Sequence, residues 1–196
     1  RSRAAASMLS TAGFREVYSM EGGMRAWDGL AARGGPDAGM ARFPEEASVV
    51  ELISLAWSLE EGSRKFYTEL PALLSDQDSV GLFHDLVIAE EHHQSMLADL
   101  GQKLTNSAAA GAVFPGEGAP GDVMEGGMNV SEALNWARDK KLADVLDLAM
   151  GLEINSYDLY IKMGRRGSDA KANELFSQLS ASEKEHLERL AGLLDR

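Results

Sequence analysis

Two similar segments decide the fold of this protein: LVIAEEHHQSML at residues 86–97 and LSASEKEHLERL at residues 179–190. In each segment leucines recur at helical spacing, and a glutamate precedes a histidine by three residues. Residues three apart lie on the same face of an α-helix, so each segment presents a carboxylate and an imidazole together. One such pair is usually part of a solvated helix face, but two in matching positions indicate a shared role. The pairs are Glu90 with His93 and Glu183 with His186.

The two segments match each other within an internal repeat, whose second copy begins 93 residues after the first. Each copy also contains an earlier matching segment: SLEEGSRKFY at residues 58–67 in the first copy and GLEINSYDLY at residues 151–160 in the second. Leucines coincide readily between any two amphipathic helices, whereas coincident glutamates, tyrosines and histidines do not. The polar matches are Glu60 with Glu153, Ser63 with Ser156, Tyr67 with Tyr160, Glu90 with Glu183, and His93 with His186.

The spacing of the glutamates places them at one depth in a pair of helical hairpins. Within each copy of the repeat the two glutamates are 30 residues apart, and their midpoints, residues 75 and 168, fall at predicted turns. Positions equidistant from such a turn lie at the same height, here roughly 20 Å away because each helical residue rises ~1.5 Å. Four carboxylates and two imidazoles are therefore predicted to converge inside the protein. The candidate metal ligands are Glu60, Glu90, His93, Glu153, Glu183 and His186.

Apolar spacing predicts four long helices, over about residues 46–73, 77–100, 141–165 and 169–194. The connection over residues 101–140 is glycine-rich at first and ends in a short helix that begins near Ser131. So long a connection is explained if the second and third helices point the same way, because the chain must then travel the length of the bundle. We therefore expect a mainly α fold, a four-helix bundle made of hairpins 46–100 and 141–195 joined by one crossover.

The ligand set selects the metal. Carboxylate oxygens with only two imidazoles suit iron or manganese better than structural zinc, and four carboxylates balance two divalent cations. We expect two iron ions, with manganese as the alternative. Two other functions stay open at this point: a module that binds and sequesters iron without turnover, and a metal-free interaction bundle.

Composition excludes several other classes of function. The net charge is −12 and the pI is about 4.8, which argues against nucleic acid and anionic membranes as partners. No apolar run approaches the ~20 residues of a membrane span. The chain has no cysteine, so disulfides, thiolate metal sites and cysteine nucleophiles are excluded for it.

At these residues the chain resembles the ferritin-like superfamily, specifically its rubrerythrin branch, over about residues 46–196. The resemblance implies that Glu90 and Glu183 bridge two irons, with Glu60 and Glu153 as terminal ligands. It also implies that Tyr67 and Tyr160 donate hydrogen bonds to the ligands; plain core tyrosines are the alternative. By this likeness the protein is an oxidoreductase, peroxidase- or ferroxidase-like, that reduces peroxide or dioxygen in oxidative-stress defence. We expect a homodimer.

Two features depart from the pattern of peroxide-reducing rubrerythrins. These proteins carry an additional glutamate three residues after the third-helix ligand, a position that is Ser156 in this chain. They also usually have an iron-tetracysteine domain, which a chain without cysteine does not provide. The resemblance therefore implies an external electron donor.

The first 33 residues resemble the C-terminal half of a rhodanese domain. The likeness rests on RSRAAASMLSTAGFREVYSMEGGMRAW at residues 1–27, and a Gly/Pro linker at residues 34–45 follows. It places the persulfide-carrying cysteine of that family about five positions before Arg1, so sulfurtransferase activity is not expected in these residues. Because the chain opens with Arg1 rather than methionine, we expect it to be a piece of a longer protein. The two resemblances together imply that this protein is a rhodanese–rubrerythrin fusion. The expected compartment is the cytoplasm.

Overall fold

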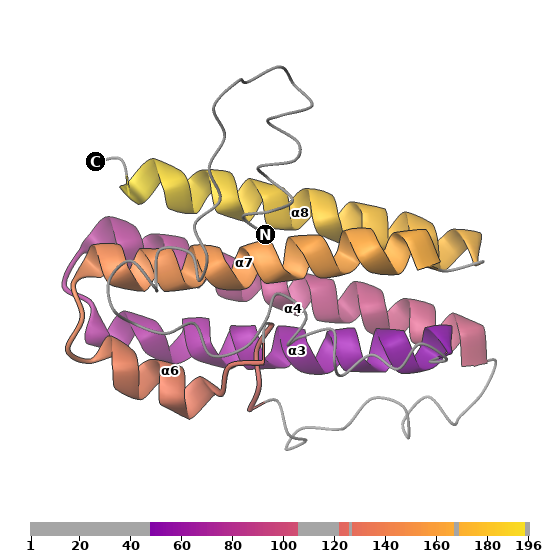
Figure 1. Ribbon diagram of the computed structural model, residues 1–196, viewed down its shortest axis with the longest axis horizontal. Coiled ribbons are helices and arrows are strands. Elements are labelled where there is room, and N and C mark those ends of the chain that lie inside the picture. Colours follow the sequence, from indigo (N-terminus) through magenta and orange to yellow (C-terminus); the bar gives the residue numbers. More distant parts are fainter. Residues whose placement is uncertain (1–47, 106–121, 126, 167–168, 195–196) are drawn as a thin grey trace, which may run out of the picture.

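Four long helices frame the protein in the computed structural model, which describes residues 48–105, 122–125, 127–166 and 169–194 (Figure 1). The predicted rhodanese-like segment 1–33 and linker 34–45 lie outside these residues. The helical elements, in chain order, are α3 Val49–Glu69, the 3-10 helix η2 Leu70–Leu73, α4 Gln77–Thr105, α6 Val130–Ala137, α7 Leu142–Arg166 and α8 Ala170–Leu194.

The helix ends follow from local capping chemistry. Ser48 and Glu51 form a reciprocal capping box at the start of α3. The Asp76 carboxylate accepts from the amide of Ser79 at 2.8 Å, and Asp169 caps α8 in the same way. The first predicted helix continues to residue 73, but α3 ends at Glu69. Because Pro71 has no amide hydrogen to continue the α-helical pattern, the chain forms the 3-10 helix η2 instead. The second predicted helix is too short, since α4 continues to Thr105.

The helices pack as two antiparallel hairpins, α3 with α4 and α7 with α8, and α4 also contacts α8. The colours of Figure 1 show that α4 ends at one end of the bundle whereas α7 begins at the opposite end. These two helices therefore run in the same direction, as the long crossover predicts. The short helix α6 packs on α3 and η2 near the start of α7. A mainly helical bundle is thus confirmed for the described part of the chain, where no helix is long and apolar enough to cross a membrane.

Two apolar clusters fill the bundle, one toward each end. The first includes Phe66, Phe83 and residues of α6; the second includes Ile53 and Phe176. Along each long helix the buried side chains change from one cluster to the other at a glutamate: Leu59 and Phe66 on either side of Glu60, for example, belong to different clusters. The polar residues of the repeat therefore occupy a layer in the middle of the bundle.

A small hairpin in the crossover packs closely on α3. Its arms are joined by backbone hydrogen bonds from Met124 to Met128 (2.8 Å) and from Val130 to Asp122 (2.9 Å), and we call residues 122–125 and 127–130 the crossover hairpin. A Cβ atom at Gly62 would overlap the carbonyl group of Val123. Glycine at this position of α3 therefore lets the hairpin backbone approach the helix.

Replacing Gly62 by alanine is expected to lower the free energy of unfolding by about 1–3 kcal/mol, because the hairpin must move away from α3. Chemical denaturation measures the effect. The matched control is Gly81→Ala in α4, where an added Cβ meets no atom within 4 Å and a better helix former replaces glycine. Equal stability of the two variants would show that the close approach at Gly62 is unimportant.

Candidate metal centre

All six predicted ligands come together in the polar layer of the bundle. Each is at most 4% exposed, and together they come from all four long helices: Glu60 from α3, Glu90 and His93 from α4, Glu153 from α7, and Glu183 and His186 from α8. Their convergence is the arrangement that the repeat predicts.

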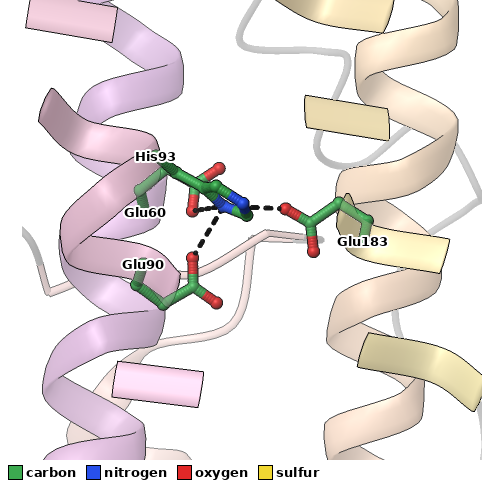
Figure 2. A group of neighbouring side chains, drawn as sticks. All are labelled: Glu60, Glu90, His93 and Glu183. Atoms are coloured by element: carbon green, nitrogen blue, oxygen red, sulfur yellow. Dashed lines mark hydrogen bonds and ion pairs between the residues drawn. The ribbon is translucent and has the colours of Figure 1, made fainter. Parts of the chain in front are cut away.

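His93 lies at the middle of the first group of candidate ligands. Its Nδ1 atom lies 3.3 Å from Glu60 Oε2, 3.3 Å from Glu90 Oε2 and 3.1 Å from Glu183 Oε1. Figure 2 shows Glu183 extending from one side of the bundle toward the other three side chains. One ligand atom from each of the four lies within 4.8 Å of the others, so this group could hold a metal ion.

His186 marks a second group that is related to the first by the repeat. Its Nδ1 atom lies 3.0 Å from Glu153 Oε2 and 3.2 Å from Glu183 Oε2. Ligand atoms of Glu90, Glu153 and His186 also lie within 4.8 Å of one another. Glu90 therefore belongs to both groups, and Glu183 directs one carboxylate oxygen to each histidine. The two imidazole rings stack with centroids 5.5 Å apart.

The two tyrosines of the repeat hydrogen-bond across the hairpins. The Tyr67 hydroxyl on α3 donates to Glu153 Oε1 on α7, and the Tyr160 hydroxyl on α7 donates to Glu60 Oε1 on α3. Both rings are fully buried. The predicted hydrogen bonds to the glutamates are therefore present, but each tyrosine serves the glutamate of the other hairpin rather than the one on its own helix.

One buried carboxylate near this cluster, that of Glu125 in the crossover hairpin, is not among the residues predicted from the sequence. Its side chain accepts a hydrogen bond from the Ser63 hydroxyl, and it lies close enough to Glu90 and Glu183 for their charges to act on it. No sequence signal identifies it, because the glycine-rich segment around it has no helical or strand periodicity. Ser156, the repeat partner of Ser63, bonds instead to the backbone oxygen of Leu152 at 3.4 Å.

Burial governs the protonation of the cluster when no cation is bound. It raises the pKa of Glu60 and of Glu183 to about 7, and it raises the pKa of Glu90 well above its usual value. Burial alone would lower the pKa of His186, but hydrogen bonds with Glu153 and Glu183 outweigh it and raise this pKa to about 10. Without a cation the site is therefore expected to hold protons that a metal ion would displace.

The donor set fits a bound cation. Glu90 Oε2 and Glu183 Oε1 are buried and have no hydrogen-bond partner, although Nδ1 of His93 lies near both. Buried charged oxygens without partners are costly, and a metal ion would compensate them. Carboxylate oxygens together with imidazole nitrogens are ligands that iron and manganese accept.

The metal-free protein is expected to lose stability as the pH rises from about 5 to about 8. Over this range Glu60, Glu183 and His186 bind more protons in the folded state than in the unfolded chain, because their pKa values are raised to about 7, 7 and 10, so the free energy of unfolding falls as the pH rises. Denaturation of chelator-treated protein across this range measures the slope. Glu183→Gln should flatten it, and Glu185→Gln, at an exposed position two residues away, should not. A metal-free protein that gains stability over this range contradicts the expectation.

Comparison with known proteins agrees with the site. A family model described as Rubrerythrin matches residues 51–194, which include all four long helices except the first two residues of α3. Searches of curated proteins and of solved structures gave no match. The family implies iron binding, and the buried Glu/His groups could hold such ions. The match covers most of the chain and coincides with the helical bundle, so this chain belongs to the rubrerythrin family.

Proposed function

We propose that this protein is a di-iron carboxylate redox protein that reduces peroxide or dioxygen. The observation that carries the proposal is the pair of buried ligand groups that share Glu90. Family membership supports iron as the metal. The ligands in this proposal are Glu60, Glu90, His93, Glu153, Glu183 and His186.

The two groups suggest a role for each ligand. Glu90 belongs to both groups and Glu183 directs one oxygen to each histidine, so these two carboxylates would bridge the ions. His93 with Glu60 would complete one ion's ligands, and His186 with Glu153 the other's. The four carboxylates match the charge of two ferrous ions.

Two ferrous ions, when bound, would supply the two electrons that convert hydrogen peroxide and two protons into two water molecules. The chain's own residues prepare the site for that reaction. Tyr160 holds Oε1 of Glu60, which leaves Oε2 beside His93; Tyr67 holds Oε1 of Glu153, which leaves Oε2 beside His186. Each terminal carboxylate is therefore oriented before a metal binds.

The surroundings of the site favour a small oxidant. Apolar clusters lie on both sides of the polar layer, and the six candidate ligands are at most 4% exposed, an arrangement that favours exclusion of bulk water and large reductants. The chain contains no cysteine to hold an iron–sulfur or iron–tetracysteine group. We therefore propose an external electron donor that restores the ferrous state. That the chain is part of a rhodanese–rubrerythrin fusion, and that it dimerises, stay predictions.

Oxidation of the iron-loaded protein tests the proposal. After anaerobic loading with ferrous iron, mixing with hydrogen peroxide in a stopped-flow instrument should give a fast absorbance change as ferric iron forms. Glu90→Gln removes the carboxylate shared by both groups and should slow this phase about tenfold or more. Glu91→Gln, at the adjacent exposed position, is the matched control and should leave the rate unchanged.

Two results would contradict the redox proposal and favour the other functions. If wild-type protein binds iron but oxidises it no faster than iron in buffer, the chain is an iron-binding module without turnover. If metal analysis of protein purified without chelator finds neither iron nor manganese, and the protein takes up neither, it is a metal-free bundle.

The tyrosine hydroxyls are expected to contribute equally to metal affinity. Tyr67→Phe and Tyr160→Phe each free one oxygen of a terminal glutamate and should weaken iron binding by about 10–100-fold. Competition with a chelator measures the affinity. The control is Tyr157→Phe, because that half-buried tyrosine is not part of the cluster. Unchanged affinity in both variants would make Tyr67 and Tyr160 ordinary core residues.

A further inference from the structure

Glu125 is a buried carboxylate that the six-residue cluster leaves unexplained. Only 1% of the residue is exposed, and its Oε1 atom has no hydrogen-bond partner. Burying an ionisable group with a free oxygen costs folding free energy unless something compensates it. Other elements of the structure must therefore account for its position.

Three separate contacts hold Glu125 in place. The crossover hairpin turns at this point, since the amide of Gly127 donates to the Met124 carbonyl at 3.0 Å and Gly127 has a φ of 79°. The Ser63 hydroxyl on α3 donates to Glu125 Oε2. The side-chain amide of Asn155 on α7 donates to the Glu125 backbone oxygen at 3.5 Å. The turn is thus anchored to both hairpins of the bundle.

The sequence of α3 is suited to receive this carboxylate. Gly62 lets the hairpin backbone reach the helix, and the next residue, Ser63, supplies the hydroxyl that binds Oε2. These adjacent residues orient one carboxylate oxygen and leave the other without a partner. The carboxylate of Glu60 is held in a similar way: Tyr160 donates a hydrogen bond to one oxygen, and the other oxygen lies beside His93.

The surroundings of the carboxylate point to a cation as its partner. Glu125 lies within electrostatic reach of Glu90, Glu183 and Tyr67. Glu90 and Glu183 each also have a buried oxygen without a hydrogen-bond partner. Three buried carboxylates that each have an oxygen without a hydrogen-bond partner repel one another, and a cation bound near them would reduce this repulsion. Glu125 is not part of the two groups whose ligand atoms lie within 4.8 Å of one another, so its carboxylate would have to approach the ion when metal binds.

We propose that Glu125 is a fifth carboxylate ligand of the metal centre, delivered by the crossover hairpin on the side of Glu90 and Glu183. The proposal rests on the proposed function, because it assumes that the cluster binds metal. It makes the site asymmetric: the hairpin reaches Ser63 of the first hairpin, whereas the matching Ser156 bonds to its own helix. Metal binding would then fasten the crossover hairpin onto α3.

Cobalt(II) binding to a glutamine variant tests the proposal. Cobalt(II) serves as the probe because its visible spectrum reports the number and type of ligands. In Glu125→Gln the Ser63 hydroxyl keeps an oxygen to bind, so the fold should be retained, and thermal unfolding of the metal-free protein checks this. We expect at least one cobalt ion to bind about tenfold or more weakly and the spectrum to change. The matched control, Glu132→Gln at an exposed position of α6, should behave as wild type.

Hydrogen exchange of the wild-type protein provides a second measurement that does not depend on any variant. The amides of Met124 and Val130 are hydrogen-bonded within the crossover hairpin. Cobalt(II) should slow their exchange in wild-type protein, and in folded Glu125→Gln this protection should be reduced.

The outcomes separate this proposal from the proposed function. If wild-type protein binds cobalt(II) while Glu125→Gln has the same affinity and spectrum, and the metal does not alter hairpin exchange, Glu125 is not a ligand and the metal centre stands without it. If wild-type protein binds neither cobalt(II) nor iron, the proposed function fails and this inference fails with it.

Discussion

The structure depends on compensation of charge in the middle of the bundle. Four glutamates and two histidines occupy one buried layer, with apolar clusters toward both ends. In such surroundings the carboxylates repel one another, and burial raises the pKa of Glu60 and of Glu183 to about 7. Protons and the two imidazoles reduce the repulsion only in part, because buried oxygens of Glu90 and Glu183 are left without hydrogen bonds. A bound cation would compensate these oxygens.

The internal repeat gives the layer its approximate twofold symmetry and also joins the two hairpins. Each tyrosine crosses from its own hairpin to the terminal glutamate of the other. The same hydroxyl therefore links the halves of the bundle and orients a candidate ligand. Packing and function are coupled at these positions, since movement of one hairpin would displace a carboxylate in the other.

The crossover hairpin breaks this symmetry. It packs on α3 at Gly62 and brings Glu125 to Ser63, and the second hairpin has no counterpart among the described residues. One side of the site is thereby covered by a segment that belongs to neither half of the repeat. A duplicated pair of hairpins has in this way acquired two unequal sides.

Much of the fold and most of the candidate site could be predicted from the sequence, because in a helix the spacing of two residues along the chain determines whether their side chains lie on the same face. Glu90 and His93 had to share a face, and equal distances from the turns put Glu60 level with Glu90. Tertiary structure alone decided which glutamate each tyrosine contacts, since the packing of one hairpin on the other is not encoded in spacing along either. Tertiary structure alone also revealed Glu125, because a glycine-rich turn has no periodicity that would predict which side chains are buried. The position of Glu125 depends on the close approach of the crossover hairpin to Gly62 and on a hydrogen bond with Ser63, some sixty residues away in the sequence.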